Sequence, residues 1–143
     1  MDMRQITPDF FAAPQVDPED MDAIAAAGIR RVVCNRPDAE VPPSHQSDVM
    51  RQAAEAVGLE FAMQPLTHQT MTPDVIAANH ALIGTYDGPV LAYCASGTRS
   101  TIAWALAAAR DMPAEEVIEA AAKGGYDLRN LFPTLTAIGN LPR

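Results

Sequence analysis

The segment from Val90 to Ser100 combines the residue types of a nucleophilic anion-binding site. It reads VLAYCASGTRS, so Cys94 directly follows an apolar run and Arg99 comes five residues later. The small residues between them allow successive backbone N–H groups to point toward one anion, and Gly97 can adopt backbone angles that other residues avoid. A guanidinium can donate two parallel hydrogen bonds to an oxyanion. This spacing predicts that Cys94 attacks an oxyanion-bearing substrate that Arg99 holds.

The residues after the loop favour a reactive thiolate at Cys94. A helix is expected over residues 101–110, and the positive end of its dipole is directed at the loop. Such surroundings stabilise the thiolate, which is the nucleophilic form of cysteine. The alternative is a buried cysteine that only fills the core. The expected substrate-binding residues are the loop residues, the serine after the loop and a second arginine: Ala95, Ser96, Gly97, Thr98, Ser100 and Arg36.

The elements that must position this loop alternate along the chain. Strands are expected over residues 10–13, 29–35, 59–64 and 90–94, and helices over residues 17–27, 46–57, 72–83, 101–110 and 113–124. No strand pattern returns after Arg99, and a short helix and a tail complete the chain. We therefore expect an α/β fold with a mostly parallel central sheet flanked by helices and an all-helical C-terminal part. Ligands of such sheets bind at the carboxyl ends of the strands. Arg36 follows a strand and is either a second anion contact or a structural arginine that binds loop carbonyls.

Length and composition limit the class of protein. The 143 residues fit one domain spanning 1–143, and ten Lys and Arg against eighteen Asp and Glu give a net charge of −8. Because nucleic acids bind broad basic surfaces, no nucleic-acid partner is expected. Apolar runs fall short of the roughly 20 residues that span a bilayer, and the first ten residues lack a secretory pattern, so we expect no membrane partner and a cytoplasmic location. Cys–His clusters with zinc spacing are absent, and no metal or other cofactor is expected.

The loop YCASGTRS resembles two kinds of active-site loop. Protein tyrosine and dual-specificity phosphatases have five residues between their cysteine and arginine, whereas this chain has four. Single-domain rhodaneses often use Cys-x-Ser-Gly-x-Arg-Ser, which this loop matches in spacing. A rhodanese usually returns to a further strand after its catalytic helix. The helices expected after Arg99 instead resemble the phosphatase fold.

A wider resemblance covers residues 3–135. The motifs at Pro14–Gln15, residues 35–38 and residues 94–100 are similar to those of the DUF442 family, also named the phosphatase-like domain of beta-lactamase-hydrolase-like proteins. The resemblance implies a protein-tyrosine-phosphatase-like fold. It leaves both phosphate chemistry and sulfur transfer open as activities.

A phosphatase also benefits from an acid that protonates the leaving oxygen. Phosphatases of this fold often carry an aspartate on the loop before the catalytic strand. The comparable loop here, residues 65–71, contains His68 and no carboxylate. A histidine has an ordinary pKa of about 6.5, so His68 is the expected general acid. The alternatives are an exposed histidine without a role, or an acid at Asp38 or Glu40, each of which could instead pair with Arg36 or face solvent.

Cys34 has two interpretations. It is either a core residue of its strand or a resolving thiol that forms a disulfide with Cys94 after oxidation. The second interpretation depends on the two cysteines lying on neighbouring parallel strands, which are about 4.8 Å apart.

The leading interpretation is a cysteine-dependent, phosphatase-like hydrolase. Its substrate would be a small anionic phosphoester or a phosphoprotein, and its intermediate a phosphocysteine at Cys94. One alternative is a rhodanese-like sulfurtransferase with a Cys94 persulfide, and another is a non-catalytic oxyanion or persulfide sensor. The loop spacing and the missing carboxylate favour sulfur, whereas the all-helical C-terminal part favours the phosphatase fold. Nothing in the sequence indicates the oligomeric state.

Overall fold

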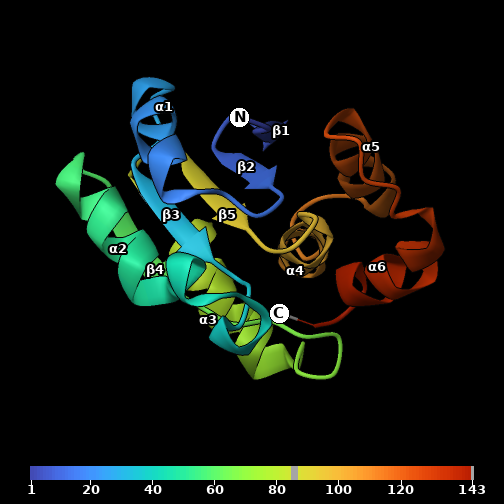
Figure 1. Ribbon diagram of the computed structural model, residues 1–143. Helices are drawn as coiled ribbons and strands as arrows, with labels where there is room; N and C mark the ends of the chain where they lie inside the picture. Colours follow the sequence, from blue (N-terminus) through green and yellow to red (C-terminus); the bar gives the residue numbers. More distant parts are fainter. Residues whose placement is uncertain (85–86, 143) are drawn as a thin grey trace.

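A five-stranded sheet forms the centre of the molecule (Figure 1). The computed structural model describes residues 1–84 and 87–142. The strands are β1 (Arg4–Thr7), β2 (Phe10–Ala13), β3 (Arg31–Cys34), β4 (Glu60–Met63) and β5 (Val90–Tyr93). Their order is β1-β2-β5-β3-β4, and all neighbours are parallel except β1 and β2. The central strand is therefore β5, whose four residues are all buried, as expected for a strand covered on both faces.

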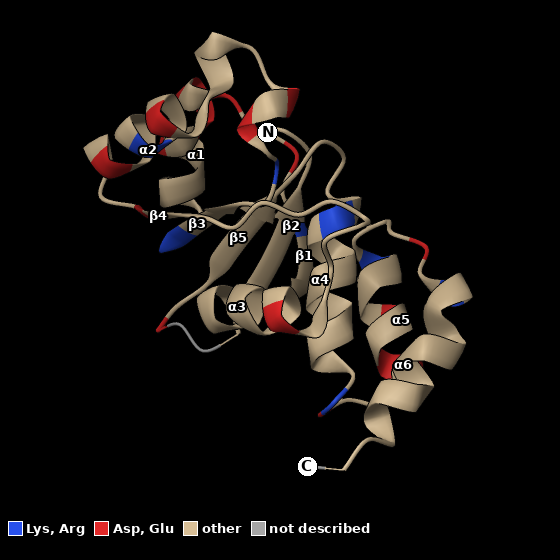
Figure 2. Cartoon of the chain, turned by 90° about the horizontal axis from the view of Figure 1, so that it is seen from below, with Lys and Arg blue, Asp and Glu red and all other residues tan. Residues whose placement is uncertain are grey.

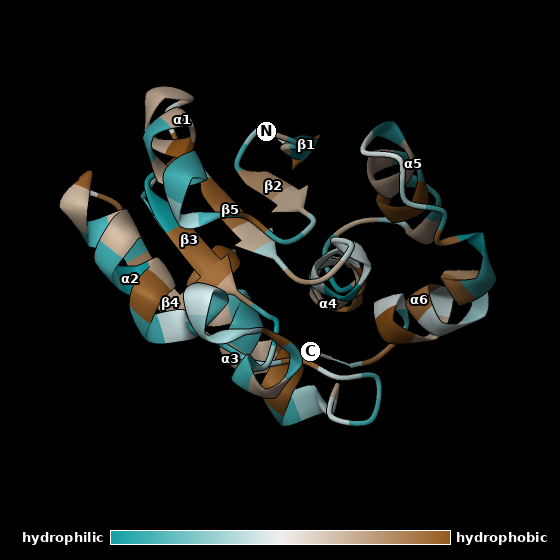
Figure 3. Ribbon diagram, in the orientation of Figure 1, coloured by the Kyte–Doolittle hydropathy of each residue, from teal (hydrophilic) through white to brown (hydrophobic). Residues whose placement is uncertain are grey.

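Helices cover both faces of the sheet. The helices are α1 (Met21–Ala26), α2 (Ser47–Ala56), α3 (Pro73–Ile83), α4 (Thr98–Ala108), α5 (Ala114–Lys123) and α6 (Phe132–Gly139). Buried residues of α1 and α2 form one apolar cluster with Leu91 and Tyr93 of β5. Residues of the other four helices form a second cluster with Val90 and Ala92. Alternate residues of β5 thus face opposite layers, and Figure 3 shows apolar residues concentrated on β3, β5 and the inner faces of the helices.

The second cluster contains an aromatic contact between the sheet and α4. Phe10 of β2 stacks on Trp104 of α4, with ring centroids 5.9 Å apart and an interplanar angle of 8°. This contact fixes α4, the helix that follows Cys94, against the central strands. Acidic residues lie on outer helices on opposite sides of the molecule, including α2 and α5 (Figure 2). Within the described residues, no helix is both long and apolar enough to cross a membrane.

The expected α/β fold, with its mostly parallel sheet and all-helical C-terminal part, is confirmed. Two details of the expectation were wrong. Strand β1 was not expected, because it is a short edge strand with only Ile6 buried and carries no clear alternating pattern. Helix α4 begins at Thr98 rather than 101, because Gly97 takes the left-handed backbone conformation (φ 93°) and ends the loop there. Arg99 and Ser100 therefore belong to the first helical turn.

Candidate active site

Cys94 lies at the carboxyl end of the central strand and is fully buried. The backbone N–H of Gly97 donates a hydrogen bond to its Sγ at 3.1 Å. An N–H group directed at the sulfur, at the positive end of α4, stabilises negative charge on it. Gly97 is required for two reasons, since its φ is positive and an added Cβ would collide with the hydroxyl of Tyr126.

The loop after Cys94 is held from three sides. The Cys94 N–H donates to the carbonyl of Ala13 at 3.3 Å, and the Gln15 N–H donates to the carbonyl of Ala95 at 3.2 Å. The hydroxyl of Tyr126, which follows α5, donates to the carbonyl of Ser96 at 3.0 Å. The segment that follows α5 thus supports the loop directly, a contact that no sequence pattern indicated.

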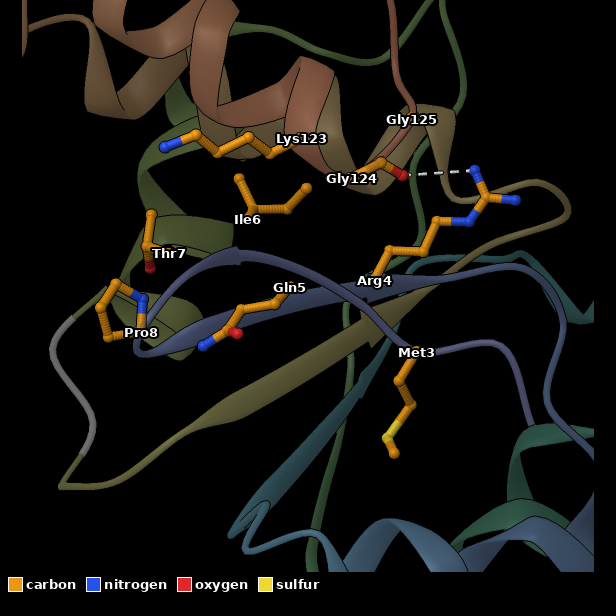
Figure 4. Close-up of a pocket in the computed structure, with 9 residues that line it drawn as sticks. All are labelled: Met3, Arg4, Gln5, Ile6, Thr7, Pro8, Lys123, Gly124 and Gly125. Carbon is orange, nitrogen blue, oxygen red and sulfur yellow. Dashed lines mark hydrogen bonds between the residues drawn. The ribbon is translucent and has the colours of Figure 1, made fainter.

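Tyr126 in turn connects the loop to the edge of the sheet. The Arg4 guanidinium lies over its ring, 5.0 Å from the centroid, and donates to the carbonyl of Gly124 at 3.3 Å (Figure 4). Around Arg4 lies an open pocket of about 780 Å³ whose lining comes from β1, its flanking residues and the end of α5. Since none of its lining residues belongs to the Cys94 loop, this pocket is separate from the candidate active site.

Arg99 is oriented by two partners. Its Nη1 donates to Glu40 Oε2 at 2.9 Å and to the carbonyl of Leu66 at 2.8 Å, and its Nη2 donates to Glu40 Oε1 at 2.8 Å. The arginine side chain is only 12% exposed. The hydrogen-bonded carboxylate raises the pKa of Arg99, and the arginine lowers the pKa of Glu40. Both groups are therefore ionised at neutral pH.

Arg36 joins the same network. Its Nε donates to Glu40 Oε1 at 3.2 Å, and its Nη1 donates to the Gln15 side-chain oxygen at 3.2 Å. The structure therefore places Arg36 on the same edge of the sheet as the Cys94 loop, which Gln15 also contacts. Its role as an anion contact stays a prediction.

A buried polar network lies behind the loop and is centred on Asn35. The Ser100 hydroxyl donates to Asn35 Oδ1 at 2.8 Å, while Asn35 Nδ2 donates to Asn79 Oδ1 at 2.9 Å and to the carbonyl of Gln64 at 2.8 Å. The hydroxyl of Ser100 thus joins α4 to the end of β3, and its role as a substrate contact stays a prediction. Asn35 was not expected as a site-building residue. The sequence feature that could have indicated it is an asparagine at the end of an apolar strand, because asparagine is uncommon in strands and a buried amide must find hydrogen-bond partners.

The expected acids lie in different settings. His68 is exposed in a turn that the Thr70 N–H closes on the Thr67 carbonyl at 3.1 Å, and its ring has no hydrogen bond to any described residue. Asp38 accepts hydrogen bonds from the N–H and hydroxyl of Ser47 at 2.8 and 2.7 Å, and so holds the start of α2. The general-acid role of His68 stays a prediction.

Ser96 and Thr98 bond to each other at the outer side of the loop. Their hydroxyl oxygens are 2.9 Å apart, and the Thr98 N–H also donates to the Ser96 hydroxyl at 3.2 Å. The pair stiffens the loop between Cys94 and Arg99. Within residues 1–84 and 87–142, no three His, Cys, Asp or Glu side chains are grouped as metal ligands.

Cys34 lies opposite Tyr93, one residue before Cys94, in the register of β3 and β5. Its thiol donates to the carbonyl of Arg36 at 3.3 Å, and burial raises its pKa. Cys34 and Tyr93 both belong to the apolar cluster under α1 and α2. Because successive side chains of a strand point to opposite faces of the sheet, the side chain of Cys94 is expected on the other face. Both cysteines are free. Their disulfide stays a prediction.

Solved structures of similar chains share this architecture. A candidate phosphatase from Neisseria meningitidis is 32% identical, with a TM-score of 0.84 over 96% of this chain and 99% of that one. PTPMT1 is 16% identical, with a TM-score of 0.73 over 96% of this chain and 95% of that one. At this low identity the second comparison shows the fold alone, and it confirms the phosphatase-like fold.

Sequence comparisons identify the family. The beta-lactamase hydrolase-like protein of Xylella fastidiosa strain Temecula1 is 34% identical over 106 residues, which are 73% of this chain and 25% of that protein. The corresponding protein of Agrobacterium fabrum is 30% identical over 92 residues, 64% of this chain and 21% of that one. This chain thus spans about a quarter of the length of these curated relatives. Residues 2–111 match the family described as "Beta-lactamase hydrolase-like protein, phosphatase-like domain", and the chain belongs to that family.

Proposed function

We propose that this phosphatase-like chain hydrolyses phosphoesters through the thiolate of Cys94. The observation that carries the proposal is the hydrogen bond from the Gly97 N–H to Cys94 Sγ, at the start of the helix that also bears Arg99. This arrangement supports a charged sulfur at the point where loop N–H groups and a guanidinium can bind an oxyanion. The phosphatase-like family and fold agree with this chemistry.

The reaction proceeds in two displacements. The Cys94 thiolate attacks phosphorus, the bond to the leaving oxygen breaks, and a phosphocysteine forms. Water then attacks phosphorus, inorganic phosphate leaves and the thiolate is restored. Arg99 and the loop N–H groups stabilise the negative charge on the phosphoryl oxygens in both steps.

The leaving oxygen needs a proton unless it leaves as a stable anion. Glu40 does not supply it, because its hydrogen bond from Arg99 lowers its pKa and keeps it ionised. We assign the proton to His68, which lies two residues after Leu66, a partner of Arg99. Because His68 is exposed in a turn, we expect aryl phosphates, whose leaving groups are weakly basic, to react faster than alkyl phosphates. Among proteins that share only the fold, TpbA of Pseudomonas aeruginosa has been crystallised with phosphotyrosine, which supports the aryl class.

Sulfur transfer is the second function that particular observations favour. The loop has four residues between Cys94 and Arg99, and the neighbouring carboxylate of Glu40 is ionised. With thiosulfate, the Cys94 thiolate would attack the outer sulfur, the S–S bond would break and sulfite would leave as an anion without any acid. The resulting persulfide would pass its outer sulfur to an acceptor thiolate.

One comparison separates these functions. Purified protein is assayed in parallel for phosphate release from p-nitrophenyl phosphate and for sulfur transfer from thiosulfate to a thiol, with Cys94→Ser as the control. Phosphate release that Cys94→Ser abolishes supports the hydrolase, because serine without an adjacent base is a weak nucleophile. Sulfur transfer without phosphate release supports the transferase. Anion binding without either activity would leave the sensor function.

A further inference from the structure

Glu40 is hydrogen-bonded to Arg99, the arginine proposed to bind the anion, although the two are 59 positions apart in sequence. It ends the short 3-10 helix Asp38–Glu40 after β3, and its side chain is about one-third exposed (35%). Both of its oxygens accept hydrogen bonds from Arg99, and Oε1 also accepts one from Arg36. This carboxylate is therefore shared by two arginines at the mouth of the candidate active site.

The hydrogen bonds of Arg99 leave one edge of its guanidinium available. Of its five N–H donors, the two on Nη1 reach Glu40 and Leu66, and one on Nη2 reaches Glu40. These hydrogen bonds use neither the Nε–H nor the second Nη2–H, and the guanidinium also interacts with the side chain of Cys94. These two donors lie on the same side of the planar group and can bind two oxygens of one oxyanion. An oxyanion can thus bind Arg99 without displacing Glu40.

We propose that Glu40 is a positioning residue that fixes Arg99 so that its Nε–Nη2 edge faces the anion held by the Cys94 loop. The proposal rests on the proposed function and deepens it. The Leu66 carbonyl restrains the guanidinium from the other side, so the group is held at three donors before substrate arrives. A preorganised donor pair is more effective than a mobile one, since no ordering is needed on binding.

The charges of the cluster agree with this role. Arg36, Arg99 and Glu40 together carry a net charge of +1, so the carboxylate does not cancel the attraction for an anion. An alternative is that Glu40 only weakens the positive field or forms a surface ion pair. The two interpretations predict opposite effects when the charge of Glu40 is removed.

The test is the affinity for inorganic phosphate, measured by protection of Cys94 from iodoacetamide. In Glu40→Gln, the side-chain NH2 would face an Nη donor of Arg99 and could not accept its hydrogen bond. Arg99 would then be held less firmly, and we expect phosphate to bind about tenfold more weakly. Loss of a nearby negative charge alone would instead tighten phosphate binding. Phosphate affinity in Glu40→Gln equal to or above that of the wild type would overturn the proposal.

Two further variants sharpen the test. Glu60→Gln is the matched control. Glu60 pairs with Arg31 at 3.1 Å at the start of β4 and β3, the ends of the strands away from Cys94, so this variant should leave phosphate affinity unchanged. Glu40→Asp keeps the charge but shortens the side chain. A positioning role predicts weaker phosphate binding in this variant, whereas a pure charge effect predicts an unchanged phosphate affinity. Thermal unfolding of each variant confirms folding, and Glu40→Asp carries the test if Glu40→Gln is unfolded. Wild-type protein that phosphate never protects would instead contradict the proposed function itself.

Discussion

At the scale of single residues, the geometry of Arg99 predicts that lysine cannot replace it. The guanidinium bonds Glu40 and Leu66, and we expect its Nε–H and second Nη2–H to bind the anion. A lysine ammonium is a single point of charge and cannot form both sets of bonds. We expect Arg99→Lys to lower kcat/KM with p-nitrophenyl phosphate by at least about a hundredfold. A kcat/KM within a few-fold of the wild type would show that the forked geometry is not needed.

The sequence predicted this site unevenly. The sequence allowed a role to be predicted for Cys94, Gly97 and Arg99. These residues are close together at a strand–helix junction, where their chemistry depends on local geometry. The pairing of Glu40 with Arg99 could not be predicted, since it depends on how the short helix after β3 packs against the first turn of α4. The same holds for the Tyr126 hydroxyl on the Ser96 carbonyl.

At the scale of elements, the junction between β5 and α4 depends on Gly97. Its φ of 93° strains any side chain, and a Cβ would meet the Tyr126 hydroxyl. We expect Gly97→Ala to reduce the free energy of unfolding by about 1–3 kcal/mol and to abolish phosphate release, because the N–H that bonds Cys94 would be displaced. Urea unfolding and the phosphatase assay measure the two effects. A fully active Gly97→Ala variant would contradict the described loop geometry.

The contact between Tyr126 and the loop is testable separately. Tyr126 lies beyond the segment that matches the family, 2–111, yet its hydroxyl bonds the Ser96 carbonyl. Tyr126→Phe keeps the ring over which Arg4 packs and removes only this bond, which contributes about 1 kcal/mol. We expect a lower kcat with p-nitrophenyl phosphate and a melting temperature reduced by a few degrees. An unchanged kcat would mean that this contact from the segment after α5 does not support the loop functionally.

The elements themselves were predicted where apolar periodicity was strong. The helices and the four strands β2 to β5 were found within a few residues of their observed bounds. The exceptions have physical causes, since edge strand β1 buries only Ile6 and α4 starts where a positive φ permits it. Such boundaries depend on tertiary packing and backbone conformation rather than on hydrophobic pattern.

At the scale of the whole molecule, the ion pair between Glu40 and Arg99 couples stability to pH. The arginine holds the pKa of Glu40 below its ordinary value of 4.5, so the folded state binds fewer protons than the unfolded state as pH falls through this range. The stabilisation is therefore present above pH 4.5 and is lost as pH falls through the lowered folded-state value. We expect the wild type to be more stable than Glu40→Gln at neutral pH and the difference to vanish in acid. Urea unfolding at several pH values measures it, and a difference independent of pH would refute the linkage.

The central claim is that Cys94 becomes phosphorylated during turnover. The most direct measurement is mass spectrometry of protein quenched in acid during reaction with p-nitrophenyl phosphate, followed by peptide mapping. The account predicts one phosphoryl group on the peptide containing Cys94, and none in Cys94→Ser. Wild-type phosphate release without that adduct, at a rate that Cys94→Ser retains, would contradict the account.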